Sequence, residues 1–261
     1  VRFDVWIKLK DIPNDDINSK FPFLTKCYKP ENEEARGEEK IVFRPSPAGQ
    51  DNLQLRTFKF IQPQPPATWL SPYCKPAIYL YPERKTEVNV SVAPQGKMLL
   101  TIPPYPKNGW DVVAEPNGDI YFGQKRFDYL YYEASIPDQL ISKPKEGFVI
   151  TYAEREKTLR NIITTLGLNE KETQQFMDYW VPILPKSPYY FIGIMPQTTL
   201  EKISPLTITP KPHSVIRVTL FFQALETKQP VTNPVLLPFN RQGFTVVEWG
   251  GIFKQDKNHP F

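Results

Sequence analysis

The sequence predicts an α+β protein that is mainly β, with an antiparallel β-sandwich-like first half and a second half in which an αα-hairpin packs on an antiparallel sheet. Proline makes up 29 of the 261 residues, about twice the usual share of ~5%, and this favours short strands with stiff connections over long helices. Apolar and polar residues alternate in many short segments, as they do in half-buried strands. The region at about 152–184 carries the period of amphipathic helices instead.

Residues 1–72 are expected to form an N-terminal β segment. Strands are predicted at 2–9, 40–44 and 53–61, and the last of these alternates most regularly. A cluster of three prolines follows at 63–66 and makes a stiff stretch, which is typical of a boundary between structural parts.

The rest of the chain is divided into a sandwich-like part at 73–146 and an α+β part at 147–261. In the first of these, the apolar run 77–81 and the alternating valines of 88–92 predict strands. The dipeptide Asn117–Gly118 lies between two further strand-like segments and supplies the positive φ angles of a tight hairpin turn.

Two helices are predicted from their caps and apolar faces. Thr151 with Glu154 has the pattern of a capping box, and Gly167 is placed to end the first helix. Asn169 with Glu172 repeats the pattern before the second helix. The apolar faces comprise Leu159, Ile162, Ile163 and Leu166, then Phe176, Met177, Trp180 and Leu184, before Pro182 and Pro185 end the second helix.

The helix pair does not have the charge pattern of a DNA-binding helix-turn-helix. The polar face of its second helix carries Glu170, Glu172, Gln174, Gln175 and Asp178. Phosphates would repel these carboxylates. The net charge is only +4, and the basic residues are interspersed with acidic ones. We therefore expect no nucleic-acid partner.

Strands are predicted again after the helix pair, at 189–194, 206–209, 215–222 and 244–249. The longest uninterrupted apolar runs of the chain fall far short of the 18 or more residues of a membrane helix. We therefore expect no membrane-spanning segment.

Sequence motifs for metals, cofactors and nucleophilic catalysis are absent. His213 and His259 are the two histidines, and neither has the spacing of a metal site or follows a Gly-x-Ser-x-Gly turn. No glycine-rich phosphate loop occurs either. We expect no metal and no cofactor.

The chain begins at Val1 without an initiator methionine, and we interpret it as a processed or truncated product of a longer precursor. Cys27 and Cys74 are a disulfide candidate, and a bond between them would stabilise the fold by ~4 kcal/mol in the chain-entropy model. Two unpaired thiols are an equal alternative.

Glu133 and Glu248 are the candidate catalytic residues, because each shares a strand face with apolar or aromatic side chains. Such surroundings raise the pKa of a carboxyl group, as a general acid requires. If their strands were neighbours, the two carboxylates would form the pair of a glycosidase, and Trp110, Tyr131 and Trp249 would line a ligand groove.

The structural alternative for both glutamates is favoured over catalysis. In this interpretation they lie at strand ends and accept hydrogen bonds from backbone or tyrosine groups. A carboxylate that promotes a Lys–Asn isopeptide crosslink is a further, less favoured alternative.

An ordered series of motifs in residues 75–251 resembles a module of uncharacterised secreted or surface proteins of bacteria. The motifs are 75–82 (KPAIYLYP), 109–112 (GWDV), 129–133 (YLYYE), 147–149 (GFV), 179–182 (YWVP) and 243–251 (GFTVVEWGG). The resemblance implies an extracytoplasmic location and one structural unit, and it carries over no catalytic residue.

We therefore expect a noncatalytic binding or structural module of a secreted or cell-surface bacterial protein, with other surface proteins or cell-wall carbohydrate as partners. The alternative is a carbohydrate-active hydrolase that uses Glu133 and Glu248. An enzyme would require the two carboxylates to converge in a concave site, whereas a binding module would present a surface for its partner.

Overall fold

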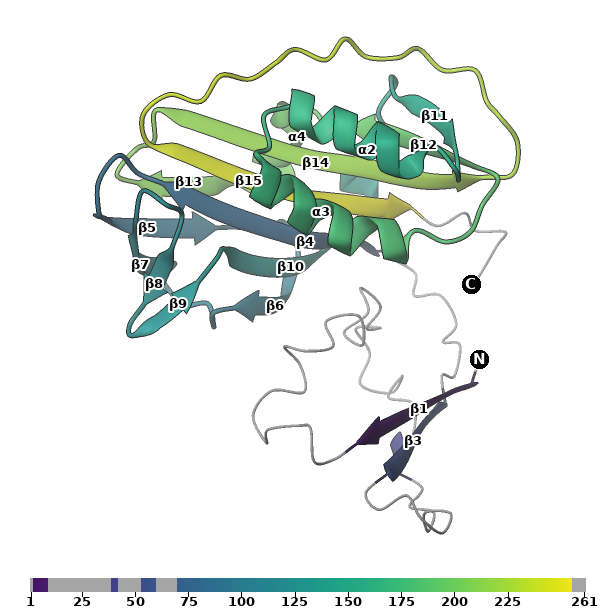
Figure 1. Cartoon of the computed structure of the whole chain (residues 1–261), viewed down its shortest axis with the longest axis horizontal. Coiled ribbons are helices and arrows are strands. Elements are labelled where there is room, and N and C mark those ends of the chain that lie inside the picture. The colour runs from purple at the N-terminus through teal and green to yellow at the C-terminus, as the bar shows by residue number, and fades with distance from the viewer. Residues whose placement is uncertain (1, 9–38, 42–52, 60–69, 255–261) are drawn as a thin grey trace. The chain divides into compact units, whose positions relative to one another are not determined.

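The computed structural model of the chain describes residues 2–8, 39–41, 53–59 and 70–254, and it divides into two compact units, Val1–Ala67 and Thr68–Phe261 (Figure 1). In the first unit, β1 (Arg2–Lys8), β3 (Leu53–Lys59) and β2 (Glu39–Ile41) form an antiparallel sheet in that order. The three strands predicted in this region are therefore present, each a little shorter than expected.

The second unit is built on a seven-stranded sheet. Its strand order is β11-β12-β14-β15-β4-β10-β6. The strands are β4 (Leu70–Tyr81), β6 (Lys97–Ile102), β10 (Leu130–Pro137), β11 (Phe148–Thr151), β12 (Tyr189–Ile194), β14 (Ser214–Leu225) and β15 (Thr245–Lys254). Strands from both 73–146 and 147–261 thus pair in one sheet.

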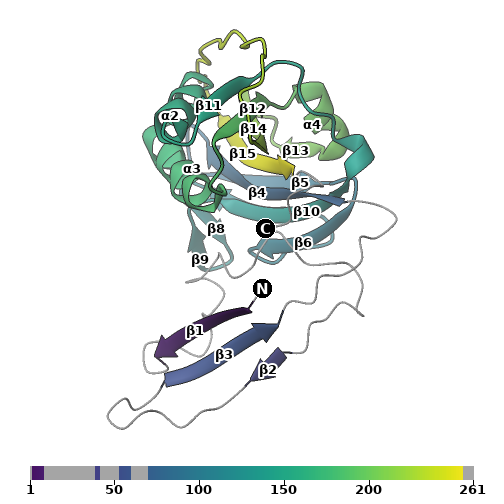
Figure 2. The same cartoon turned by 90° about the vertical axis from the view of Figure 1, so that its right-hand side faces the viewer.

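A five-stranded sheet covers one face of the larger sheet and makes the sandwich (Figure 2). It comprises β13 (Leu206–Thr209), β5 (Thr86–Val92), β7 (Trp110–Ala114), β8 (Ile120–Phe122) and β9 (Lys125–Phe127), in this order. One continuous apolar core joins the two sheets, and it includes Ile78 and Leu80 of β4 as well as Val88 and Val90 of β5. Burial of this core supplies the main favourable free energy of the unit.

The helix pair covers the opposite face of the larger sheet. It consists of α2 (Arg155–Thr165) and α3 (Glu170–Ile183), and its place confirms the prediction of a hairpin of helices on a sheet. Trp180 of α3 stacks on Phe222 of β14, with ring centroids 4.6 Å apart. Gly251 of β15 makes this close approach possible, because a Cβ atom there would lie 2.3 Å from Trp180.

A short third helix, α4 (Gln197–Ile203), was not predicted and lies on the sandwich side of the sheet. It follows β12 and buries Leu200 and Ile203 in the core shared by the two sheets. A 3-10 turn, η3 (Asp138–Leu140), follows β10. With seven residues, α4 is too short for a helical period of apolar residues to be recognised in the sequence.

The helix caps agree with the sequence in one case and differ in the other. Asn169 and Glu172 form the predicted capping box at the start of α3. The prediction for Thr151 is wrong, because this residue ends β11 and α2 begins four residues later, with Glu154 at its N-cap. The Glu154 carboxylate instead accepts hydrogen bonds from the backbone amide and the hydroxyl of Thr151, at 2.9 and 2.8 Å. These hydrogen bonds, and first of all the one from the backbone amide, lower the pKa of Glu154.

All pairs formed by the described strands are antiparallel except β14 and β15, which are parallel. Two neighbouring parallel strands require a connection that runs back from the end of the first strand to the start of the second. Residues 226–244 make this connection, without helix or strand structure, and Figure 1 shows them passing over the unit from the end of β14 to the start of β15. We call residues 226–244 the crossover segment. The antiparallel arrangement expected for this part of the chain is thus corrected at one pair.

The helices in the described part of the chain are all too short or too polar to cross a membrane.

Candidate functional site

Glu248 lies near the middle of β15, and its side chain is fully buried. Its Oε2 accepts a hydrogen bond from Arg217 Nε at 2.6 Å, and its Oε1 accepts one from the Tyr132 hydroxyl at 2.8 Å. Arg217 is the register partner of Glu248 on the parallel strand β14, so the sheet itself brings the two charges together. The carboxylate charge is therefore balanced by a buried cation.

The cap of α4 completes this polar cluster. Ser204, which follows α4, accepts a hydrogen bond at its carbonyl oxygen from Arg217 Nη2 at 2.8 Å. Its hydroxyl lies 2.7 Å from that of Tyr132. The buried cluster of Glu248, Arg217, Tyr132 and Ser204 thus links the strands β15, β14 and β10 of the larger sheet to the end of α4.

Glu133 lies on β10 in a different environment. It accepts a hydrogen bond from the Tyr131 hydroxyl, and only 6% of its surface is exposed. Burial and the neighbouring Glu133 carboxylate raise the pKa of Tyr131 and that of Tyr179 on α3 well above the usual value. Glu133 therefore faces the helix pair.

The two candidate carboxylates lie on opposite faces of the larger sheet. Glu248 pairs in register with Ile78, which pairs with Leu130, so these three share the face turned to the smaller sheet. Glu133 is three residues after Leu130 and therefore on the other face, as is Tyr131. The structure does not bring the two carboxylates together, and both residues are buried.

The rings predicted to line a ligand groove belong to the core. Trp110 is fully buried between the sheets and donates a hydrogen bond from Nε1 to the carbonyl of Pro103 at 3.1 Å. Trp249 is fully buried on the helix side, and Tyr131 is 8% exposed. The prediction of a groove lined by these rings is therefore corrected, because Trp110 packs in the core between the two sheets and the other two rings are buried within the larger sheet's packing.

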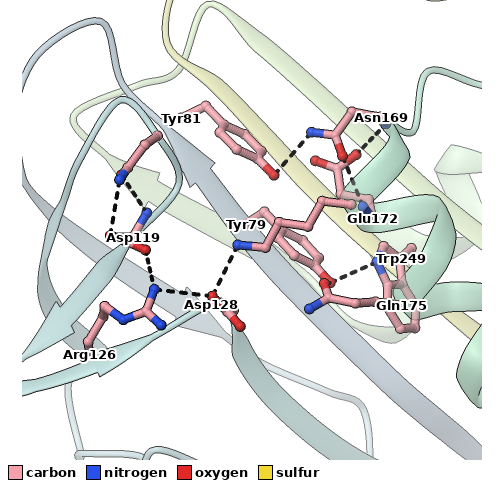
Figure 3. A network of polar contacts seen from close by, with 11 residues as sticks. Tyr79, Tyr81, Asp119, Arg126, Asp128, Asn169, Glu172, Gln175 and Trp249 are labelled. Atoms are coloured by element: carbon pink, nitrogen blue, oxygen red, sulfur yellow. Dashed lines mark hydrogen bonds and ion pairs between the residues drawn. The ribbon is translucent and has the colours of Figure 1, made fainter.

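A second polar network lies on the helix side, at the start of α3 (Figure 3). The buried Glu172 carboxylate accepts hydrogen bonds from the amide of Asn169, at 2.8 Å, and from the guanidinium of Arg241 in the crossover segment. Arg241 also donates to the carbonyl of Gly167 at 2.7 Å, and Asn169 Nδ2 donates to the Tyr81 hydroxyl at 3.3 Å. The network therefore ties the crossover segment to the helix pair.

This network extends along α3 through further side chains. The Tyr79 hydroxyl donates to Gln175 at 2.6 Å and accepts from Trp249 Nε1 at 3.2 Å. Farther along the chain of contacts, Lys171 lies 3.1 Å from Asp128. Figure 3 shows Tyr79 of β4 and Gln175 of α3 pointing toward one another, with Trp249 of β15 beside them. Their hydrogen bonds hold the helix pair in register with the sheet.

A polar hairpin lies at the outer end of the network. Arg126 of β9 donates to Asp119 at 2.6 Å, and this hydrogen bond lowers the pKa of the exposed Asp119 carboxyl. Gly118, with φ +88°, forms the predicted tight turn and lies against the Tyr81 ring. The smaller sheet thus reaches the same polar network.

The remaining candidate residues have structural roles or lie outside the described residues. His213 Nδ1 accepts a hydrogen bond from the amide of Phe244 at 3.0 Å. Cys27, the side chain of Cys74, and His259 lie outside the part of the chain that the structure describes. Among the described residues, no three His, Cys, Asp or Glu side chains gather as a metal site requires.

Two apolar surface features stand apart from the polar networks. The crossover segment carries Val235 and Leu237 with 85% and 73% of their surface exposed. A groove of ≈ 580 Å³ lies between the end of β6 and the β8–β9 hairpin. Its lining comprises Thr101, Ile102, Pro103, Pro104, Phe122, Gln124, Lys125 and Phe127.

Sequence reasoning missed the arginine partners of two buried glutamates, Arg217 for Glu248 and Arg241 for Glu172. The signal for the partner of Glu248 was present: Arg217 is the one charged residue of its strand, and Glu248 is the one acidic residue of its own. Two such exceptions within buried strands indicate a pair. Arg241 had no comparable signal, because it follows a region without periodicity.

Comparison with known proteins yields one similarity. The chain matches no known protein family and no solved structure. Over 61 residues it is 41% identical to a protein of Butyrivibrio fibrisolvens named "Uncharacterized protein in bglA 3'region". The match covers 23% of this chain and 64% of that protein, so the chain spans less than two thirds of the relative's length. The relative's name assigns no activity.

Proposed function

We propose that the chain is a noncatalytic binding or structural module of a secreted or cell-surface bacterial protein. The observation that carries the proposal is the position of Glu133 and Glu248 in the fold. Both are buried, both accept hydrogen bonds from side chains of the fold, and they lie on opposite faces of one sheet. A glycosidase needs its two carboxyl groups on either side of one scissile bond.

The rigidity of the second unit supports the same role. Two polar networks and a continuous core hold two sheets and three helices together. A stiff body of this kind presents its surface to a partner without losing conformational entropy on binding. Other surface proteins or cell-wall carbohydrate are the partners that we propose.

The extracytoplasmic location is part of the proposal. It is supported by the resemblance of residues 75–251 to modules of secreted and surface proteins. Protease treatment of intact source cells tests it. Digestion of the protein without lysis of the cells is expected.

The noncatalytic assignment is tested with the purified full chain and two probes, peptidoglycan sacculi and a soluble β-glucan. Release of reducing ends is measured for the wild type and for Glu133→Gln and Glu248→Gln. We expect no release above the buffer background from any of the three. Release by the wild type that Glu248→Gln abolishes, with an unchanged circular-dichroism spectrum and melting temperature, would establish the hydrolase instead.

A further inference from the structure

The crossover segment combines exposure with attachment at both ends. Val235 and Leu237 are two positions apart and are the most exposed of the large apolar side chains in the described part of the chain. The segment is nevertheless held to the unit, because the carbonyl of Thr232 accepts a hydrogen bond from Gly147 at 3.0 Å and Arg241 anchors the far end. It therefore projects apolar groups from a fixed path.

The composition of the segment suits it to act as a ligand. From Gln229 to Asn240 it contains no ionisable residue. Pro230, Pro234 and Pro238 recur every four residues, and proline restricts the chain to extended, polyproline-like conformations. Docking such a segment removes no charge from water and costs little conformational entropy.

The groove beside β6 and β9 has the matching chemistry. Its walls include the partly exposed rings of Phe122 and Phe127, together with Pro103 and Pro104. Lys125 is the only ionisable residue among those that line it. Aromatic-lined grooves are a common receptor for proline-bearing extended segments. The volume of ≈ 580 Å³ falls within the range of about 300–1,000 Å³ of ligand sites.

The two surfaces cannot meet within one copy of the second unit. Figures 1 and 2 both show the crossover segment on the side opposite to β6, β8 and β9. A second copy can supply the missing surface. Contacts of this kind use two different patches and join copies head to tail, giving open chains unless the rotation closes them.

We propose that residues 229–240 of one copy dock into the groove between β6 and the β8–β9 hairpin of a second copy. This inference deepens the proposed function, on which it rests, by naming the module's partner as another copy of the same chain. The buried contact is apolar and pairs the exposed side chains of Val235 and Leu237 with Ile102 and the two phenylalanine rings. It makes the module a unit of a head-to-tail assembly.

Sedimentation velocity of the full chain measures the association. The weight-average mass of the wild type should rise with concentration from the 30.3 kDa of a monomer. Leu237→Asp removes the ligand side and Ile102→Asp removes the groove side, and Ile102 is 42% exposed and therefore tolerant of the change. Each variant should weaken the association at least about tenfold. Leu140→Asp, at an apolar position outside both surfaces whose exposure of 45% is close to that of Ile102, should associate as the wild type does.

Mixing the two variants gives the decisive result. The Leu237→Asp copy keeps an intact groove and the Ile102→Asp copy keeps an intact crossover segment, so a 1:1 mixture should form a dimer and stop there. Two monomers in the mixture, or wild-type behaviour of either variant alone, would overturn the inference. So would a monomeric wild type that sediments with phosphatidylcholine vesicles through Leu237, which would assign the segment to a lipid surface.

The outcome is separate from that of the glycan assay. A wild type that stays monomeric at every concentration refutes the head-to-tail contact and leaves the noncatalytic assignment standing. Glycan turnover in a chain that still associates would refute the assignment and leave the contact.

Discussion

At the scale of single residues, Arg217 and Glu248 form a buried ion pair across two strands of the larger sheet. Removing one charge leaves the other buried without its partner, and such changes cost about 3–5 kcal/mol. We expect Arg217→Met to lower the free energy of unfolding by that amount. Urea unfolding followed by circular dichroism measures it.

The double variant Arg217→Met/Glu248→Leu is the matched control. Apolar residues of similar volume often replace a buried ion pair at little cost, so the double variant should recover most of the stability lost by the single one. Additive losses would show that the two side chains act independently, in contradiction to the 2.6 Å contact between them.

At the scale of elements, the packing of α3 on β15 depends on Gly251. A Cβ atom at this position would meet the Trp180 ring at 2.3 Å, and overpacking of a core costs about 1–3 kcal/mol. Gly251→Ala should therefore lower the free energy of unfolding by this amount, measured in urea. In a Trp180→Phe background the smaller ring leaves room, so the loss should shrink; an equal loss in both backgrounds would place the strain elsewhere.

The elements also show what the sequence could and could not predict. The strands β12 and β13 begin and end where the sequence predicts. Gly167 ends α2 and the capping box of Asn169 with Glu172 begins α3, also as predicted, because these signals are local. The parallel pairing of β14 with β15 has no local signal. It follows from where the crossover segment returns, which depends on contacts such as that of Arg241 with Glu172.

The candidate site was predicted less well for the same reason. Alternation correctly places Glu133 beside Tyr131 on one strand face, and their hydrogen bond confirms it. Which face of the sheet each glutamate occupies depends on register across β4, and a shift by one residue reverses it. A sequence carries no such information between strands so far apart in the chain.

At the scale of the whole molecule, the buried tyrosines should limit stability at high pH. Burial, more than any other cause, raises the pKa values of Tyr79, Tyr81, Tyr131 and Tyr179 above the usual value. Below the usual tyrosine pKa of about 10, both folded and unfolded states keep these phenols neutral and the free energy of unfolding is unaffected. Above it the unfolded state loses protons that the folded state retains, so stability falls.

Each such tyrosine should reduce the free energy of unfolding by about 1.4 kcal/mol for every pH unit above 10, until the folded state also ionises. Tyr81→Phe removes one of these protons and should flatten the decline by that slope, although it weakens the neutral protein through loss of the Asn169 contact. Urea titrations from pH 8 to 11 (roughly the range over which free tyrosine ionises) separate the two effects, because the lost contact lowers the whole curve and the lost proton changes only its slope above pH 10. An unchanged slope would mean that Tyr81 ionises alike in both states, and the raised pKa of this partly buried hydroxyl would then be wrong.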